Sequence, residues 1–80
     1  MPNVARVGPY RVFFYSNEGD EPPHVHVERE GRSAKFWLDP VGIASSGGHS
    51  IPELRRIERM VRDHRDMYLE SWREFFWGRQ

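Results

Sequence analysis

A single, largely apolar stripe runs through the last third of this 80-residue chain. Its members recur at spacings of three and four, which is the period of one face of an α-helix: Leu54, Ile57, Val61, His64, Tyr68, Trp72 and Phe75. Ser50 and Glu53 have the spacing of a capping box, and Pro52 is tolerated in a first helical turn. The pattern predicts one long helix over residues 50–77, about seven turns in length.

Three segments before the helix are typical of β-strands. Residues 10–15 are rich in β-branched and aromatic side chains, residues 24–28 alternate between polar and apolar, and residues 34–38 are again largely apolar. Residues 4–7 are a candidate for a fourth strand, whereas residues 41–49, which contain two adjacent glycines, are expected to form a connection. The sequence therefore predicts one α+β domain over residues 1–80, with a small antiparallel sheet of three or four strands and the helix packed on one face.

The composition restricts the setting of this domain. The chain has no cysteine, which favours a reducing compartment and excludes cysteine-based zinc sites. It has neither an apolar signal-peptide core near its start nor a membrane-spanning stretch, so we expect a cytoplasmic protein without membrane contact. Twelve basic residues balance twelve acidic ones, so binding to a nucleic acid would require a local basic patch.

Strand alternation sorts the side chains of the predicted sheet into two faces. One face is entirely apolar and is the expected floor for the helix: Val12, Phe14, Val25, Val27, Ala34, Phe36 and Leu38. The other is mixed: Arg11, Phe13, Tyr15, His24, His26, Glu28, Lys35 and Trp37. One helix can cover only one face, so the mixed face is expected to lie open. It could be solvated, associate with a second copy as a homodimer, or bind a ligand or nucleic acid.

The mixed face carries groups suited to RNA chemistry. His24 and His26 project from the same side of a strand and titrate near neutrality, and Lys35 could stabilise a phosphorane. This pattern predicts His24, His26 and Lys35 as catalytic groups of a ribonuclease that needs no metal. Four further residues would bind RNA or a partner through charge and ring stacking: Arg11, Phe13, Tyr15 and Trp37.

The His24–His26 pair also has the residue types of a metal site, because neutral imidazole binds zinc, copper or iron. Glu28 continues the row but lies about 13 Å from His24 along an extended strand. A third ligand would have to come from another strand or another subunit, so the leading expectation is no metal and no cofactor. His49 is expected in an exposed loop, and His64 at the boundary of the core.

A second basic feature lies on the predicted helix, where Arg55, Arg59 and Arg62 fall on one side. Glu58 and Arg62 form a favourable i,i+4 pair, so a solvated charged face is the simpler interpretation. The same strip could instead contact phosphates or an acidic partner.

Several blocks of the sequence together resemble the DUF4160 family of small bacterial domains of unknown function. The resemblance covers nearly the whole chain and rests on residues 8–11, 14–16, 21–27, 34–40 and 53–57, with Trp72 and Phe75-Phe76 near the end. It implies a place in a toxin–antitoxin-like gene pair, and therefore a toxin-like component acting on RNA or translation, with a small antitoxin-like partner protein. It assigns no catalytic residue. The alternative is a non-enzymatic protein-interaction or dimerisation domain.

Overall fold

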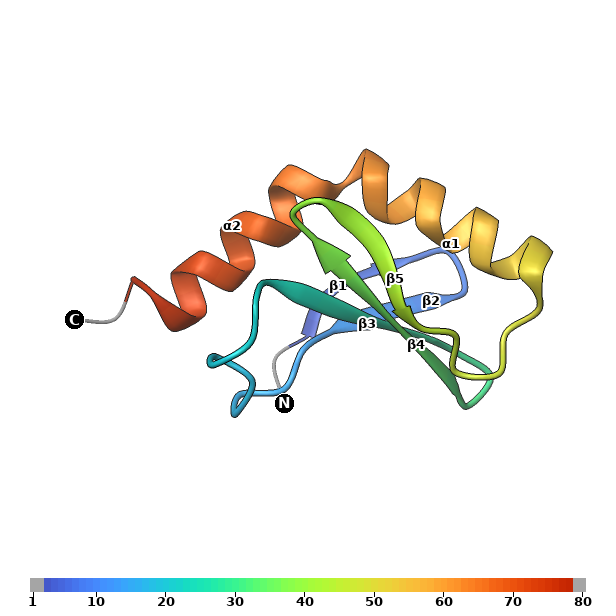
Figure 1. The fold of residues 1–80 in the computed structure, drawn as a ribbon, viewed down its shortest axis with the longest axis horizontal. Helices are drawn as coiled ribbons and strands as arrows, with labels where there is room; N and C mark the ends of the chain where they lie inside the picture. Colours follow the sequence, from blue (N-terminus) through green and yellow to red (C-terminus); the bar gives the residue numbers. More distant parts are fainter. Residues whose placement is uncertain (1–2, 79–80) are drawn as a thin grey trace.

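The computed structural model describes residues 3–78, in which five strands precede two helices (Figure 1). The strands are β1 (Asn3–Val7), β2 (Tyr10–Phe13), β3 (His24–Arg29), β4 (Arg32–Leu38) and β5 (Val41–Ser45). The helices are α1 (Ile51–Asp63) and α2 (Arg65–Phe76). Each strand pairs antiparallel with the next, in the order β1-β2-β3-β4-β5. The predicted α+β class with an antiparallel sheet is confirmed.

Both helices lie across one face of the sheet, and the core fills the space between them (Figure 1). The register pairs Val12 with Val27, Val27 with Ala34, and Val25 with Phe36, so the apolar side chains of neighbouring strands share that face. All seven residues of the predicted apolar face are buried. The helices contribute a matching set: Ile57, Met60, Val61, Tyr68, Leu69 and Trp72.

The sheet has more strands than predicted, and the difference lies at its two ends. The candidate strand over residues 4–7 is confirmed as part of β1. The expectation that residues 41–49 only connect sheet and helix is wrong, because Val41–Ser45 pairs with β4 as β5. Val41 and Ile43 face Leu38 and Phe36 across a hairpin, and only residues beyond Ser45 form the connection. β2 is shorter than predicted and ends at Phe13 rather than at residue 15.

The predicted single helix over residues 50–77 is also wrong, because the helix breaks at His64. His64 has φ −111° and ψ 16°, outside the helical region, and its ring Nδ1 donates to the Met60 carbonyl at 2.9 Å. The Met60 carbonyl thus accepts from both the ring and the backbone N–H of His64, and side-chain bonds of this kind to the carbonyl four residues back accompany bends in helices. The break lets α1 and α2 meet at a bend above the sheet (Figure 1). Neither helix is long and apolar enough to cross a membrane.

Candidate functional site

The segment between β2 and β3 folds over part of the face that was expected to be open. The backbone N–H of Leu38 donates to the Pro23 carbonyl at 3.0 Å and anchors one end of this segment to β4. Gly19 lies against α2 so closely that an added Cβ would stand 2.7 Å from Phe76 Cδ1. Phe13 is only 2 % exposed and His24 is 0 % exposed. The prediction of an uncovered second face is therefore wrong for these two residues.

Glu18 brings a carboxylate from this covering segment to the two histidines. The Glu18 backbone N–H donates to the Tyr15 carbonyl at 3.2 Å, and the Tyr15 N–H donates to Glu18 Oε1 at 2.9 Å. These two bonds hold the side chain over β3, with Oε1 2.9 Å from His24 Nε2 and Oε2 3.0 Å from His26 Nε2. One ligand atom from each residue lies within 4.8 Å of the other two. We call these three residues the Glu18–His24–His26 cluster.

His24 forms the buried end of the cluster. Its Nδ1 lies 2.9 Å from the Pro22 carbonyl oxygen, which can only accept, so Nδ1 carries the proton of that bond. A neutral ring then has its lone pair on Nε2. His24 Nε2 is buried beside Glu18 but is not aligned for a hydrogen bond with any of residues 3–78. The Trp72 ring packs 4.8 Å from the imidazole, between centroids, and closes the site toward α2.

His26 lies on the solvent-facing side of the cluster. Its side chain is 14 % exposed, and its ring stacks on Phe13 with centroids 5.3 Å apart. Tyr15 meets the same ring edge-on at 5.0 Å and is itself exposed. Ring packing on two sides thus fixes the imidazole while leaving one approach from solvent.

The carboxyl group of Glu18 is held in its charged form. Burial alone would raise the pKa of Glu18, but the Tyr15 N–H and the imidazoles of His26 and His24 outweigh burial. The net effect places the Glu18 pKa below its ordinary value of 4.5. At neutral pH the cluster therefore holds an anionic carboxylate beside two imidazole rings, an arrangement that can accept protons or bind a cation.

The two cations predicted for this face are present, but each already has an anionic partner. Lys35 faces His26 across β3 and β4, and its Nζ lies 2.6 Å from a carboxylate oxygen of Glu21 and 4.7 Å from the Trp37 ring centroid. Arg11 pairs with Glu28 and lies over the Phe13 ring. The face thus brings together every predicted member of the mixed set, yet it is not basic, because its two cations lie among three carboxylates, those of Glu18, Glu21 and Glu28.

Glu18 and Glu21 were not among the residues predicted from the sequence. Both lie in the covering segment, whose path over the sheet depends on contacts with β4 and α2 rather than on local pattern. The available signal was an acidic residue six positions before the His-x-His pair, close enough in sequence for a loop to return it. Glu28, which continues the histidine row, does not join the cluster.

The predicted arginine strip lies elsewhere, on the exposed surface of α1. Arg55, Arg59 and Arg62, with Glu58, surround a shallow pocket of about 370 Å³. Arg62 is bonded to Glu58 at 2.7 Å, as the i,i+4 spacing predicted. The structure does not bring this strip into the Glu18–His24–His26 cluster.

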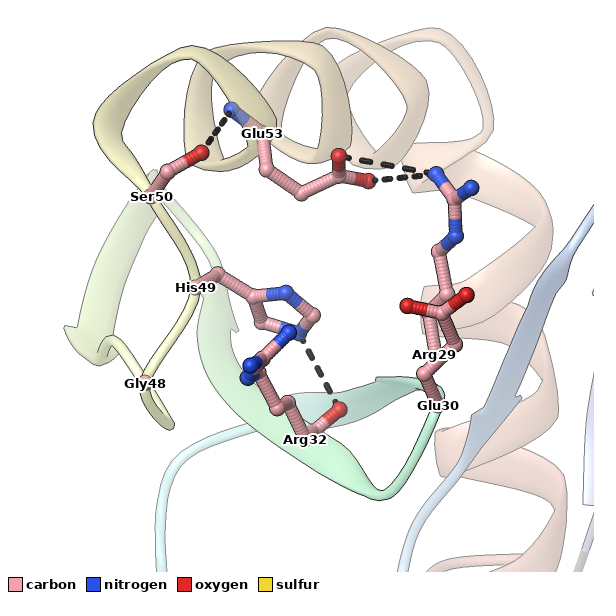
Figure 2. A pocket seen from close by; sticks show the side chains of 7 residues that line it. All are labelled: Arg29, Glu30, Arg32, Gly48, His49, Ser50 and Glu53. Carbon is pink, nitrogen blue, oxygen red and sulfur yellow. Dashed lines mark hydrogen bonds and ion pairs between the residues drawn. The ribbon is translucent and has the colours of Figure 1, made fainter.

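A further pocket of about 340 Å³ lies where α1 begins, beside the β3–β4 hairpin (Figure 2). Ser50 Oγ accepts from the Glu53 N–H, as expected for an N-cap, but the Glu53 side chain points away from Ser50. Its carboxylate instead accepts from Tyr10, Arg29 and Arg56, so only half of the predicted capping box forms. Because Arg29 of β3 bonds to Glu53 of α1 across this pocket, we interpret the pocket as a joint between helix and sheet.

The contacts at this joint also lower the pKa of Glu53 and hold the ring of His49. The Tyr10 hydroxyl and, more weakly, the Arg29 guanidinium hold the pKa of Glu53 below 4.5. His49 Nε2 donates to the Arg32 carbonyl at 3.0 Å (Figure 2). His49 thus lies at this joint and outside the cluster.

Comparison with known proteins gives one match. The sequence model of DUF4160, described as a domain of unknown function, matches residues 10–73, a stretch that contains the whole Glu18–His24–His26 cluster and Lys35. No curated protein matches. No solved structure matches.

Proposed function

This chain belongs to the DUF4160 family, and we propose that it is a toxin-like component of a bacterial toxin–antitoxin module that acts on RNA. The observation that carries the proposal is the convergence of three ionisable side chains, with one ring at the surface and one buried, beside exposed Tyr15 and the Lys35 cation. Charged and titratable groups gathered at a partly enclosed place are the usual marks of a reaction site.

The chemistry that fits this surface is cleavage of an RNA phosphodiester by transesterification. The ribose 2′ oxygen attacks phosphorus, the bond from phosphorus to the 5′ oxygen breaks, and the 2′ proton passes to a base in the cluster. The departing 5′ oxygen takes a proton from Lys35, whose ammonium also opposes the charge of the phosphorane. The side chains of His26 and Glu18 are equally exposed, at 14 %, so the cluster would reach the substrate through these two groups. His24 is buried between the Pro22 carbonyl and the Trp72 ring, so it would not contact the substrate.

The aromatic rings beside the cluster suit an unpaired nucleotide. Tyr15 is exposed, and Trp37 is half-buried with the Lys35 ammonium over its ring. Single-stranded RNA is commonly held by stacking on such rings, with a smaller part for charge. Stacking would support binding even though Lys35 and Arg11 are already paired with carboxylates.

A second candidate, an interaction domain for a small partner protein, is favoured by a separate groove. The groove has a volume of about 530 Å³ and lies between the edge strand β1 and the last turns of α2. Val4, Phe14 and Phe75 line it, so an extended apolar peptide could lie beside the free edge of β1. An antitoxin-like partner would fit there without occupying the cluster.

Growth on inducing the gene tests the leading proposal. We expect the wild type to arrest growth and cleave single-stranded RNA, and His26→Ala to lose both while keeping its far-UV circular dichroism spectrum. His49→Ala removes a histidine from the joint at α1 and serves as the matched control, which should behave as wild type. A wild-type protein that neither arrests growth nor cleaves RNA would contradict the proposal, as would full toxicity of His26→Ala.

A further inference from the structure

We propose that the Glu18–His24–His26 cluster is a binding site for one divalent transition-metal ion of the zinc type. The ligand atoms would be a Glu18 carboxylate oxygen, His24 Nε2 and His26 Nε2. A part for the ion in RNA cleavage rests on the proposed function, whereas binding of the ion depends only on the geometry of the three side chains.

The spacing of the three donors fits the coordination sphere of such an ion. Zinc bonds of 2.0–2.2 Å in a tetrahedron place neighbouring ligand atoms about 3.3 Å apart. Glu18 Oε1 lies 2.9 Å from His24 Nε2. His26 Nε2 donates to the Glu18 carboxylate, at 3.2 Å from Oε1 and 3.0 Å from Oε2, and a bound ion would take the place of that proton. All three donors remain within 4.8 Å of one another. Two imidazoles and one carboxylate are also a set that protein zinc sites use.

The orientation of the His24 ring also suits a metal ligand. Its Nδ1–H is held by the Pro22 carbonyl, which leaves the Nε2 lone pair directed into the cluster. Metal-bound histidines usually donate their other ring nitrogen to a carbonyl or carboxylate in this way, which fixes the tautomer. A buried lone pair facing an anionic oxygen at 2.9 Å is unfavourable unless a cation lies between them.

A proton on His24 Nε2 would not resolve this contact as well as a metal ion would. A proton lies close to the line joining donor and acceptor, but His24 Nε2 and Glu18 Oε1 are not aligned for a hydrogen bond despite their short separation. A metal ion lies off that line, at the point where the lone pairs of all ligands converge. An ion shared by the three side chains would therefore suit this contact better than a proton between two of them.

The carboxylate is held in place in the same manner as His24. Glu18 Oε1 accepts the Tyr15 N–H, so a backbone group fixes the oxygen from outside the cluster. Phe13 and Tyr15 pack against the His26 ring and restrict its rotation. Each of the three ligands thus has a support that does not depend on the ion, which is how protein metal sites are preorganised.

Three protein ligands leave a fourth position of a tetrahedron for water or substrate. That position would face the solvent side of His26, where Tyr15 and Lys35 lie. Glu18, His24 and His26 would hold the ion, and the ion would lower the pKa of a water molecule beside the substrate, which would supply a base for the 2′ proton. An ion of charge +2 would also supply the positive charge that this surface lacks, since its two cations lie among three carboxylates.

Titration of Zn²⁺ into the full, tag-free chain against a chromophoric chelator tests the site. We expect one ion per chain, with affinity reduced at least ten-fold in His26→Ala and in Glu18→Gln. His49→Ala removes a histidine outside the cluster and should leave affinity unchanged. Circular dichroism would establish that each variant is folded. A wild type that binds no Zn²⁺, or cluster variants that bind it as the wild type does, would overturn the proposal.

Two measurements on the wild-type protein do not depend on the folding of any variant. Together they distinguish binding of the ion from cleavage of RNA. Bound Co²⁺ should give the strong visible absorption of four-coordinate cobalt, and the weak bands of six-coordinate cobalt would overturn the assignment. RNA cleavage that persists in excess chelator would refute the part assigned to the ion in the reaction. Full Zn²⁺ binding without RNA cleavage would refute the proposed function and leave the metal site intact.

Discussion

Replacing Phe36 with alanine tests the face assignment on which the account of the site rests. Phe36 lies in β4 between Val25 of β3 and Ile43 of β5, and it is 0 % exposed beneath the helices. Removing the ring forfeits about 150 Å² of buried apolar surface, worth about 4 kcal/mol at 25 cal/mol per Å². Similar truncations in protein cores cost about 3–5 kcal/mol. Since an 80-residue domain has a total stability of about 4–12 kcal/mol, the variant should be near the limit of folding.

Lys35→Ala is the matched control, one position away and on the opposite face. The Lys35 side chain is 22 % exposed, and its partners are Glu21 and the Trp37 ring. Such partly solvated contacts are worth about 1 kcal/mol or less. Urea denaturation followed by tryptophan fluorescence would give both free energies of unfolding. A loss for Lys35→Ala equal to that for Phe36→Ala would refute the assignment of the two faces.

Three further predictions concern single positions. Gly47→Ala should lower the free energy of unfolding by at least about 2 kcal/mol, because Gly47 has φ +64° and an added Cβ would stand 2.1 Å from the Ser33 carbonyl oxygen. Gly42→Ala has open space around the added Cβ and should lower it by less than about 1 kcal/mol in the same denaturation experiment. Tyr68→Phe should leave the thermal midpoint unchanged or raise it, since the Tyr68 hydroxyl is buried without a hydrogen-bond partner among residues 3–78. Glu53 has a lowered pKa, so its ionisation stabilises the fold above about pH 4.5. The difference in free energy of unfolding between wild type and Glu53→Gln should therefore shrink as the pH falls through the pKa of Glu53 in the folded protein. A difference that grows in acid would contradict this.

The elements that the sequence predicts well are those governed by periodicity. Alternation placed Val25, Val27 and Phe36 on one face, and all are buried. The helix break escaped prediction because neither glycine nor proline marks it, and the bond from the His64 ring to Met60 exists only in the folded chain. β5 was missed because the adjacent glycines suggested a loop for the whole segment, although only the part beyond Ser45 is one.

In the candidate site, too, strand alternation predicted some features, whereas tertiary contacts set the others. The spacing of His24 and His26 predicted that both rings share one side of a strand, and strand register brought Lys35 opposite His26. Alternation specifies a side but not what covers it, so the burial of His24 could not be deduced. Glu18 joins the cluster because of tertiary contacts, among them the fit of Gly19 against α2, which no local pattern reveals.

A crystal structure of the tag-free protein grown with equimolar Zn²⁺, with anomalous diffraction data collected at the zinc edge, tests the metal site most directly. We predict one anomalous peak per chain, bonded at about 2.0–2.2 Å to a carboxylate oxygen of Glu18, His24 Nε2 and His26 Nε2, with a fourth ligand on the solvent side. Density for zinc only at other residues, or no zinc density with the three side chains placed as described, would contradict it.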